Sequence, residues 1–339
     1  MNFETIGTQT DKKPAEACLN AIEAQLTGVA ANDFPLLVQN LALANSICSN
    51  PNDLRAALSG YVLSYSPNTT PEACLGLIRF DAHDAQSQMS RAKAAADAGD
   101  FNIAMSAMTA LMAKIEKLFR RFPKSTIFNF NNDFEAFVYR RANFNAETTY
   151  CAPFDLAQAY NFFGKLHLHA NDIDRAIAYF RRALDWNPVN PAYYLDLAAA
   201  YFTKREFKLH EINTSLAYRY LLTAEHYKRF YFEEARRFDN DSDHKFAAEL
   251  YKLCLAFGDH ARARGGLEYI EKFWFKCATP PLSRAHLSQS CADHHLEFGP
   301  SPEMQKDITA FTGKAPHSPT LPIIQAENQA SLAKWNSII

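Results

Sequence analysis

Apolar residues recur three and four positions apart along most of the chain, which is the spacing of one face of an α-helix. The pattern predicts helices at residues 15–30, 33–49, 52–64, 71–98 and 101–122, and it returns densely from 153 to about 277. Residues suited to cap a helix N-terminus stand near the starts of these stretches, namely Asp33, Asn52, Thr70 and Asp100. The dipeptide Gly99-Asp100 predicts a tight turn between two antiparallel helices.

Two stretches depart from this pattern. Residues 124–150 begin with the run 127–132, which predicts a short extended segment leading into one helix. Prolines concentrate after residue 279, where one short helix is predicted at 302–311, ended by Gly313. The chain is therefore predicted to have four parts: an N-terminal helical region at 12–122, a connector at 123–152, a repeat array at 153–277 and a C-terminal segment at 278–339.

The stretch 157–190 is 34 residues long and divides into two amphipathic helices. Its diagnostic positions are Tyr160, Phe163 and Gly164 on the first helix, Ala176, Phe180 and Ala183 on the second, and Pro188 at the end. Larger side chains than those of Gly164 and Ala176 would hold the two backbones apart, so these two residues are predicted to face each other.

These seven positions resemble the tetratricopeptide repeat, with His167 in place of the usual tyrosine. The resemblance implies an all-α solenoid of helical hairpins. A second unit follows from Pro191, and a third begins at about Ala224 with its register open between Tyr227 and Tyr231. A degenerate unit is predicted upstream on the residues Ala92, Ala95, Ala104, Met108 and Leu111.

A looser resemblance covers roughly residues 127–270. The runs 128–132 and 183–190 are similar to a group of bacterial repeat proteins to which no activity is assigned. This resemblance implies a repeat architecture and a bacterial source.

Composition fits a folded helical chain. The 339 residues are 48% hydrophobic and contain only 11 glycines, too few for a turn-rich sheet. The 35 basic and 37 acidic residues give a formal net charge of −2, which does not favour nucleic acid or an anionic membrane as a general partner. No apolar stretch is long enough to span a bilayer. The seven cysteines are scattered without a CxxC pair, which predicts reduced thiols and a soluble, cytoplasmic protein.

The resemblance implies that the inner face of the first helix of each repeat binds a peptide or helix of a partner protein. By spacing, this predicted groove contains Gln158, Asn161 and Lys165 from the first unit and Leu195, Ala199 and Phe202 from the second. It is polar at one end and apolar at the other, which suits an amphipathic segment. Alternatively, Leu195 and Phe202 pack beneath a neighbouring helix.

Some members of the family clamp a carboxylate with lysine and asparagine on successive first helices. The chain has Asn161 and Lys165, but Asp196 and Glu249 stand near places where amide or basic side chains are expected. An acidic side chain there would repel a carboxylate, so this clamp is not predicted.

Other binding chemistry is less favoured. Four Arg-Arg pairs, which begin at residues 120, 140, 181 and 236, suggest RNA, but adjacent helical residues point about 100° apart, so each pair predicts a solvated helix edge. A zinc site on Cys277, Cys291, His294 and His295 would lack the closely spaced first pair of ligands. No metal site, cofactor or catalytic constellation is predicted.

The sequence thus favours a non-enzymatic scaffold that binds a protein or peptide, with the oligomeric state and the partner open. The alternative is a regulatory or catalytic protein whose activity lies in residues 12–122 or 277–339, with the repeats as a targeting arm. A helix at about 325–336 is predicted to align Leu332 and Trp335 and to dock on the body, either near 273–275 or in the groove.

Overall fold

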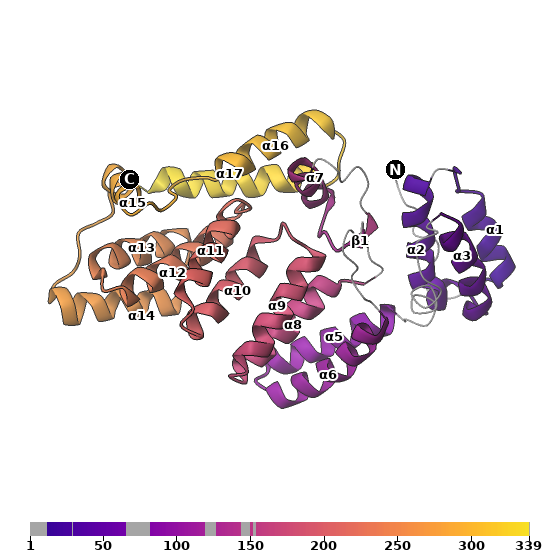
Figure 1. Cartoon of the computed structure of the whole chain (residues 1–339). Helices are drawn as coiled ribbons and strands as arrows, with labels where there is room; N and C mark the ends of the chain where they lie inside the picture. Colours follow the sequence, from indigo (N-terminus) through magenta and orange to yellow (C-terminus); the bar gives the residue numbers. More distant parts are fainter. Residues whose placement is uncertain are drawn as a thin grey trace. The chain divides into compact units, whose positions relative to one another are not determined.

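A computed structural model describes residues 12–28, 30–65, 82–118, 127–143, 150–151 and 154–338 (Figure 1). These residues form an all-α fold of helical hairpins, which confirms the predicted fold class. A two-residue parallel contact joins β1 (Ile127–Phe128) and β2 (Tyr150–Cys151), and an isolated parallel bridge joins Lys13 and Cys48. The second half of the predicted helix at 71–98 is present, and residues 71–81 lie outside the described ranges.

The chain divides into two compact units. Unit 1 comprises residues 1–130, 144–166 and 185–187, and unit 2 comprises residues 131–143, 167–184 and 188–339. The helices of unit 1 are α1 (Ala15–Glu23), α2 (Ala30–Ile47), α3 (Pro51–Tyr65), α5 (Ala82–Asp97), α6 (Phe101–Leu118) and most of α8 (Leu156–His169).

Unit 2 contains the following helices: α7 (Asp133–Ala142), α9 (Ile173–Trp186, to residue 184), α10 (Pro191–Thr203), α11 (Phe207–Tyr218), α12 (Ala224–Asn240), α13 (His244–Phe257), α14 (Ala261–Ile270), the π-helix η1 (Glu271–Phe275), α15 (Arg284–Asp293), α16 (Pro302–Lys314) and α17 (Leu321–Ser337). Helix α15 was not predicted from the sequence. It buries only two residues, Leu287 and Cys291, so it has no extended apolar stripe that periodicity could reveal.

The start of α2 differs from the prediction. The helix begins at Ala30, so Asp33 lies in its first turn instead of at its N-cap. Asp33 is almost fully buried and accepts hydrogen bonds from the backbone N–H groups of Thr27 and Gly28, at 2.7 and 2.8 Å. The carboxylate therefore organises the loop that precedes the helix.

One turn geometry recurs in four helical hairpins of the described chain. In each turn a residue with positive φ follows the first helix: Gly99 at 87°, Asn171 at 60°, Arg205 at 64° and Ser242 at 67°. The next residue donates its N–H to a carbonyl five positions earlier: Asp100 to Ala95 at 2.8 Å, and Asp172 to His167, Glu206 to Tyr201 and Asp243 to Phe238, all at 2.9 Å. This is the Schellman arrangement, and it identifies α5–α6, α8–α9, α10–α11 and α12–α13 as equivalent hairpins.

The shared turn fixes the register of the third unit. Ser242 is equivalent to Asn171, a separation of 71 positions, so Tyr231 is the equivalent of Tyr160. Tyr227 lies one helical turn earlier, in an N-terminal extension of α12. Both tyrosines are buried, so apolar pattern alone leaves the two registers indistinguishable.

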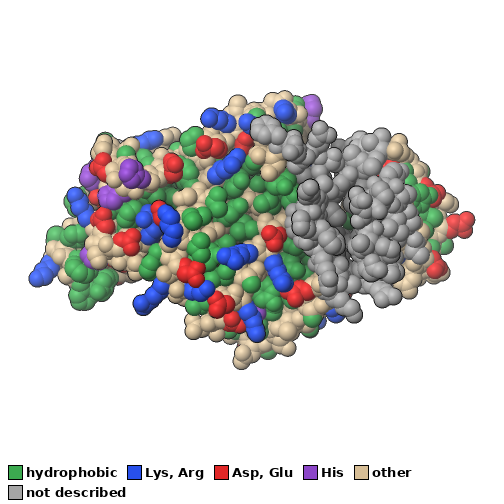
Figure 2. Space-filling view, viewed as in Figure 1, with side chains coloured by type: hydrophobic (Ala, Val, Ile, Leu, Met, Phe, Trp, Pro, Cys, Tyr) green, Lys and Arg blue, Asp and Glu red, His purple; other side chains and the backbone are tan. Residues whose placement is uncertain are grey.

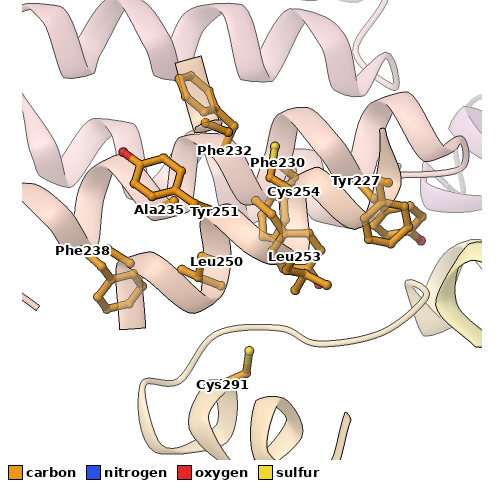
Figure 3. Close-up of a cluster of buried hydrophobic side chains, with 14 of the residues drawn as sticks. Tyr227, Phe230, Phe232, Ala235, Phe238, Leu250, Tyr251, Leu253, Cys254 and Cys291 are labelled. Carbon is orange, nitrogen blue, oxygen red and sulfur yellow. The ribbon is translucent and has the colours of Figure 1, made fainter. Parts of the chain in front are cut away.

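The main core of unit 2 gathers between α12 and α13 (Figure 3). Phe230, Tyr231 and Leu253 are fully buried there, and Cys291 reaches the same cluster from α15. A smaller cluster joins the second helix of the first repeat to the first helix of the second, through Phe180 and Tyr201. Residues from the C-terminal segment are thus part of the core of the array.

The C-terminal helix docks on the array as predicted, although at a different place. Trp335 of α17 is 1% exposed, and its ring lies 5.5 Å from that of Tyr227 and 4.9 Å from that of Phe257. It therefore covers α12 and α13, and it leaves Phe273 and Trp274 exposed. Of the two docking places predicted for the tail, residues 273–275 and the groove, the first is wrong, because the buried aromatic rings that accept the indole lie on α12 and α13.

The connector of unit 1 has a specific structural role. Asn129 is buried, its side-chain N–H donates to the carbonyl of Phe154 at 2.8 Å, and its side-chain oxygen accepts from the N–H of Leu156 at 3.0 Å. The amide therefore satisfies the free N–H groups at the start of α8.

Candidate protein-binding surface

The predicted groove residues of α8 lie in unit 1 and differ in exposure. Gln158 accepts a hydrogen bond of 2.6 Å from the ammonium group of Lys93 on α5. Asn161 is 5% exposed, whereas Lys165 is exposed. Of these three, Asn161 offers little surface to a partner.

The predicted residues of α10 lie in unit 2 and also separate into two kinds. Leu195 is fully buried and belongs to the core between α10, α12 and α13, so for this residue the packing alternative is the correct one. Ala199 and Phe202 are partly exposed. A binding role for the exposed positions stays a prediction.

Phe202 lies at the centre of a group of aromatic and basic side chains. Its ring contacts those of Phe207 and His210 edge to face, with ring centres 5.4 Å apart in both cases. The guanidinium of Arg236 lies over the same ring, 4.0 Å from its centre. A cation at this distance from an aromatic face is attracted by the ring quadrupole and is held in place by it.

Arg236 continues this group from α10 to α12. It contacts the ring of Phe232 at 5.5 Å, and it donates a 2.8 Å hydrogen bond to the carboxylate of Glu233. Glu233 is 5% exposed, so the ion pair orients Arg236 from beneath.

Arg262 of α14 extends the group to a third helix. Its guanidinium lies 4.8 Å from the ring centre of Phe232, and the residue is exposed. We call Phe202, Arg236 and Arg262 the arginine–aromatic surface, together with the Phe232 ring that both arginines contact and that is itself only 4% exposed. It runs across α10, α12 and α14, all within unit 2.

Asp196 does not act as a free acid at this surface. It is 8% exposed and forms an ion pair of 2.5 Å with Arg229 of α12. Its negative charge is therefore compensated within the array, which removes the repulsion that the sequence suggested. Glu249 is likewise held, by His286 of α15 at 2.8 Å.

The residues considered as zinc ligands lie in different environments and have different contacts. Cys277 is exposed and Cys291 is fully buried in the core. His294 stacks on Phe246 with ring centres 3.9 Å apart, and one ring nitrogen lies 2.8 Å from the carboxylate of Asp243. Within the described part of the chain, no group of three or more His, Cys, Asp or Glu residues could hold a metal ion.

The Arg-Arg pairs have separate partners. Arg236 bonds Glu233 and Arg237 bonds Glu234, while Arg141 forms an ion pair of 2.9 Å with Asp307. The pair at residues 120–121 lies outside the described residues. The two arginines at 236–237 therefore have different partners, but they do not form the solvated helix edge that was predicted, because their side chains are only 20% and 15% exposed.

A hollow of about 620 Å³ is a second feature of unit 2, next to α11 and α12. Its floor includes Glu234, which is 2% exposed and receives two hydrogen bonds from Arg237, at 2.9 and 2.7 Å. Glu211 at its edge is paired with Lys208 at 3.0 Å. Much of its charge is compensated internally, so it is a weaker candidate than the arginine–aromatic surface.

The sequence did not lead us to place Phe232, Arg236 or Arg262 in the binding groove, although the Arg-Arg pair at residue 236 was noted. The signal was available for the first two: they stand 71 positions after Asn161 and Lys165, the groove residues of the first unit. It could not be used while the register of α12 was open between Tyr227 and Tyr231.

Comparison with known proteins agrees with the repeat found in the sequence. The tetratricopeptide repeat family model matches residues 157–190. No curated protein matches the chain, so the bacterial resemblance stays a prediction. None of the described helices is long and apolar enough to cross a membrane. The match covers one repeat of residues 157–190, and the described helical hairpins on either side of it are consistent with a tetratricopeptide-like helical repeat fold. Repeats of this family typically mediate protein interactions.

Proposed function

We propose that this chain is a non-enzymatic scaffold that binds a segment of another protein at the arginine–aromatic surface. The observation that carries the proposal is the position of Phe202, partly exposed, with Arg236 held over its ring. Ala199 lies one turn earlier on α10 and is also partly exposed, so a bound backbone could approach closely there. This surface contains two arginines, whereas the groove predicted from the sequence contains one basic residue, Lys165.

The chemistry of the surface favours an amphipathic segment with acidic side chains. Arg262 is exposed and lies against Phe232. The side chain of Arg236 is 20% exposed, although it is paired with Glu233. A carboxylate can bind a guanidinium bidentately while apolar side chains cover the partly exposed ring of Phe202 beside it. Lys165 of α8 is also positively charged and would favour an acidic partner. It remains a predicted contact residue in unit 1.

The C-terminal segment supports the scaffold over a catalytic flank. Leu287, Cys291 and Trp335 belong to the same core as α12 and α13. Burial raises the pKa of both Cys254 and Cys291 to about 12, so these thiols are protonated and unreactive at neutral pH. Buried free thiols also support the cytoplasm as the place of action.

Selection from a random linear-peptide library on the purified full-length chain tests the proposal. We expect enriched peptides to combine acidic and apolar residues. The charge reversal Arg262→Glu should weaken the selected peptides at least about tenfold. The matched control is Arg175→Glu on α9, an exposed arginine outside the surface, which should leave affinity unchanged.

Two results would contradict the proposal. One is a selection that enriches no peptide. The other is a set of peptides that bind Arg262→Glu as tightly as the unaltered chain, which would place the binding site elsewhere.

A further inference from the structure

Four large aromatic side chains are exposed at the end of α14 and in η1. The exposed fractions are 52% for Tyr269, 57% for Phe273, 55% for Trp274 and 36% for Phe275. Figure 2 shows hydrophobic side chains gathered at this end of α14. We call residues 269–276 the terminal aromatic patch. Exposed aromatic groups in such density usually mark an interaction site.

The patch is held in a defined conformation. The rings of Tyr269 and Phe273 lie 4.9 Å apart, and the Trp274 indole stacks on His244 with ring centres 3.9 Å apart. The π-helical turn η1 places Phe273, Trp274 and Phe275 on the surface in succession. Because α17 docks on α12 and α13, the C-terminal helix does not cover these rings.

The charges within the patch are biased towards positive. Lys272 and Lys276 are exposed, and the ammonium of Lys272 lies 5.2 Å from the Phe273 ring centre. Glu271, the acid between the aromatic residues, is engaged within the protein. Its carboxylate accepts hydrogen bonds of 2.8 and 2.6 Å from the N–H and hydroxyl of Thr279. Glu268 is the exposed acid of this end of α14.

We propose that the terminal aromatic patch docks this protein on an anionic membrane surface. Aromatic rings partition into the interfacial region of a bilayer, and lysine side chains reach acidic headgroups while their stems remain among apolar groups. The patch supplies both elements within eight residues. The contact is peripheral and involves no bilayer-spanning helix.

The charge distribution favours a lipid surface over a second copy of the chain. A two-fold contact through this patch would bury Lys272 and Lys276 near its centre, where Glu268 is the one exposed acid of residues 268–276. Lysine is depleted from the centres of protein interfaces. An anionic surface supplies opposite charge to both lysines while their side chains stay solvated.

Tryptophan fluorescence gives a site-specific test, because the chain has three tryptophans and two of them are buried. Trp186 is 6% exposed and Trp335 is 1% exposed, against 55% for Trp274. The full-length protein is mixed with phosphatidylcholine vesicles that contain phosphatidylglycerol, and separately with vesicles of phosphatidylcholine alone. We expect sedimentation with the anionic vesicles, a blue-shifted emission and reduced quenching by acrylamide, all reversed by high salt.

Variants separate this contact from a general change in the protein. The charge reversals Lys272→Glu and Lys276→Glu together should lower partitioning into anionic vesicles at least about tenfold. Trp274→Ser should remove the fluorescence change and weaken sedimentation. Matched controls are Lys306→Glu on α16 and Ile103→Ser on α6, since both residues are exposed and lie outside the patch.

Two outcomes would overturn the proposal. The first is equal sedimentation with both kinds of vesicle, or with neither. The second is a concentration-dependent dimer without lipid in which Trp274 becomes protected, because the patch would then be occupied by a second copy. Neither outcome affects peptide binding at the arginine–aromatic surface, which is tested by Arg262→Glu.

Discussion

The guanidinium carbon of Arg236 lies 4.0 Å from the ring centre of Phe202, which links the first helix of one hairpin to the first helix of the next. The two residues are 34 positions apart, and both are partly exposed. Their contact therefore serves two purposes: it joins neighbouring repeats, and it presents a fixed cation at the proposed binding surface.

A double-mutant cycle on this pair should reveal favourable coupling. Phe202→Leu removes the aromatic face, and Arg236→Gln removes the positive charge. We expect the effects of the two substitutions on the free energy of unfolding to be non-additive by about 0.5–1 kcal/mol, as for a partly exposed cation–π contact. Urea denaturation of the single and double variants measures these free energies. The control cycle of Phe202→Leu with Arg175→Gln should be additive, and equal coupling in both cycles would contradict a specific contact.

Gly164 tests the close packing of the first repeat. It is buried in α8, and its equivalents 34 and 71 positions later, Ala198 and Ala235, are also fully buried. Gly164→Leu should overpack this position and lower the free energy of unfolding by about 1–3 kcal/mol. Thermal and urea denaturation measure the change. Ala170→Leu at the exposed end of the hairpin should have little effect, and unchanged stability of Gly164→Leu would remove the assignment.

Trp335 tests the docking of the C-terminal helix. Its ring contacts those of Tyr227, Tyr231, Phe257 and Phe298. Trp335→Ala should destabilise the protein by about 3–5 kcal/mol, and deletion of residues 320–339 should lower the melting temperature. Ile323→Ala on the same helix is the control, because Ile323 is 58% exposed. Identical melting of the truncated and full-length proteins would mean that the helix is free in solution.

His226 should make stability depend on pH. Its ring nitrogen accepts from the N–H of Thr223, and the Thr223 hydroxyl accepts from the N–H of His226, which forms a capping box at the start of α12. Burial, and then the charge of Arg229, lower the pKa of His226 to about 4 from its usual 6.5. The folded state thus holds the neutral ring, so this stabilisation is complete above pH 6.5 and is lost as pH falls towards 4.

The variant His226→Gln isolates that titration. Glutamine retains the capping acceptor and does not titrate, so its stability relative to the unaltered protein should rise by at most about 3 kcal/mol between pH 7 and pH 4. Urea denaturation at a series of pH values measures the difference. A difference that is constant over this range would show that His226 titrates normally in the folded protein.

Asn129 should stabilise α8 from the connector. Asn129→Ala removes the acceptor for the N–H of Leu156 and the donor to the carbonyl of Phe154 in a buried site. We expect a loss of about 1–3 kcal/mol in the free energy of unfolding. Asn131→Ala, at an exposed position, should change it by less than about 0.5 kcal/mol. Equal effects of the two substitutions would contradict a capping role for Asn129.

The sequence by itself determined the local features of this protein. Periodicity predicted most of the described helices, and the positions from Tyr160 to Pro188 predicted the repeat that the family comparison also finds. Such features depend on spacing within one hairpin, and each of the four described repeat turns is closed by a hydrogen bond between residues five positions apart. Short-range geometry of this kind is encoded directly in the order of residue types.

Only the tertiary structure decided how the hairpins of unit 2 and its C-terminal segment combine. It selected Tyr231 over Tyr227, placed Trp335 on α12 and α13, and buried Leu195 while leaving Phe202 partly exposed. Each of these outcomes depends on which apolar faces meet across long stretches of sequence. A stripe of apolar residues predicts that a helix packs against something, but the partner surface is selected by shape and burial in three dimensions.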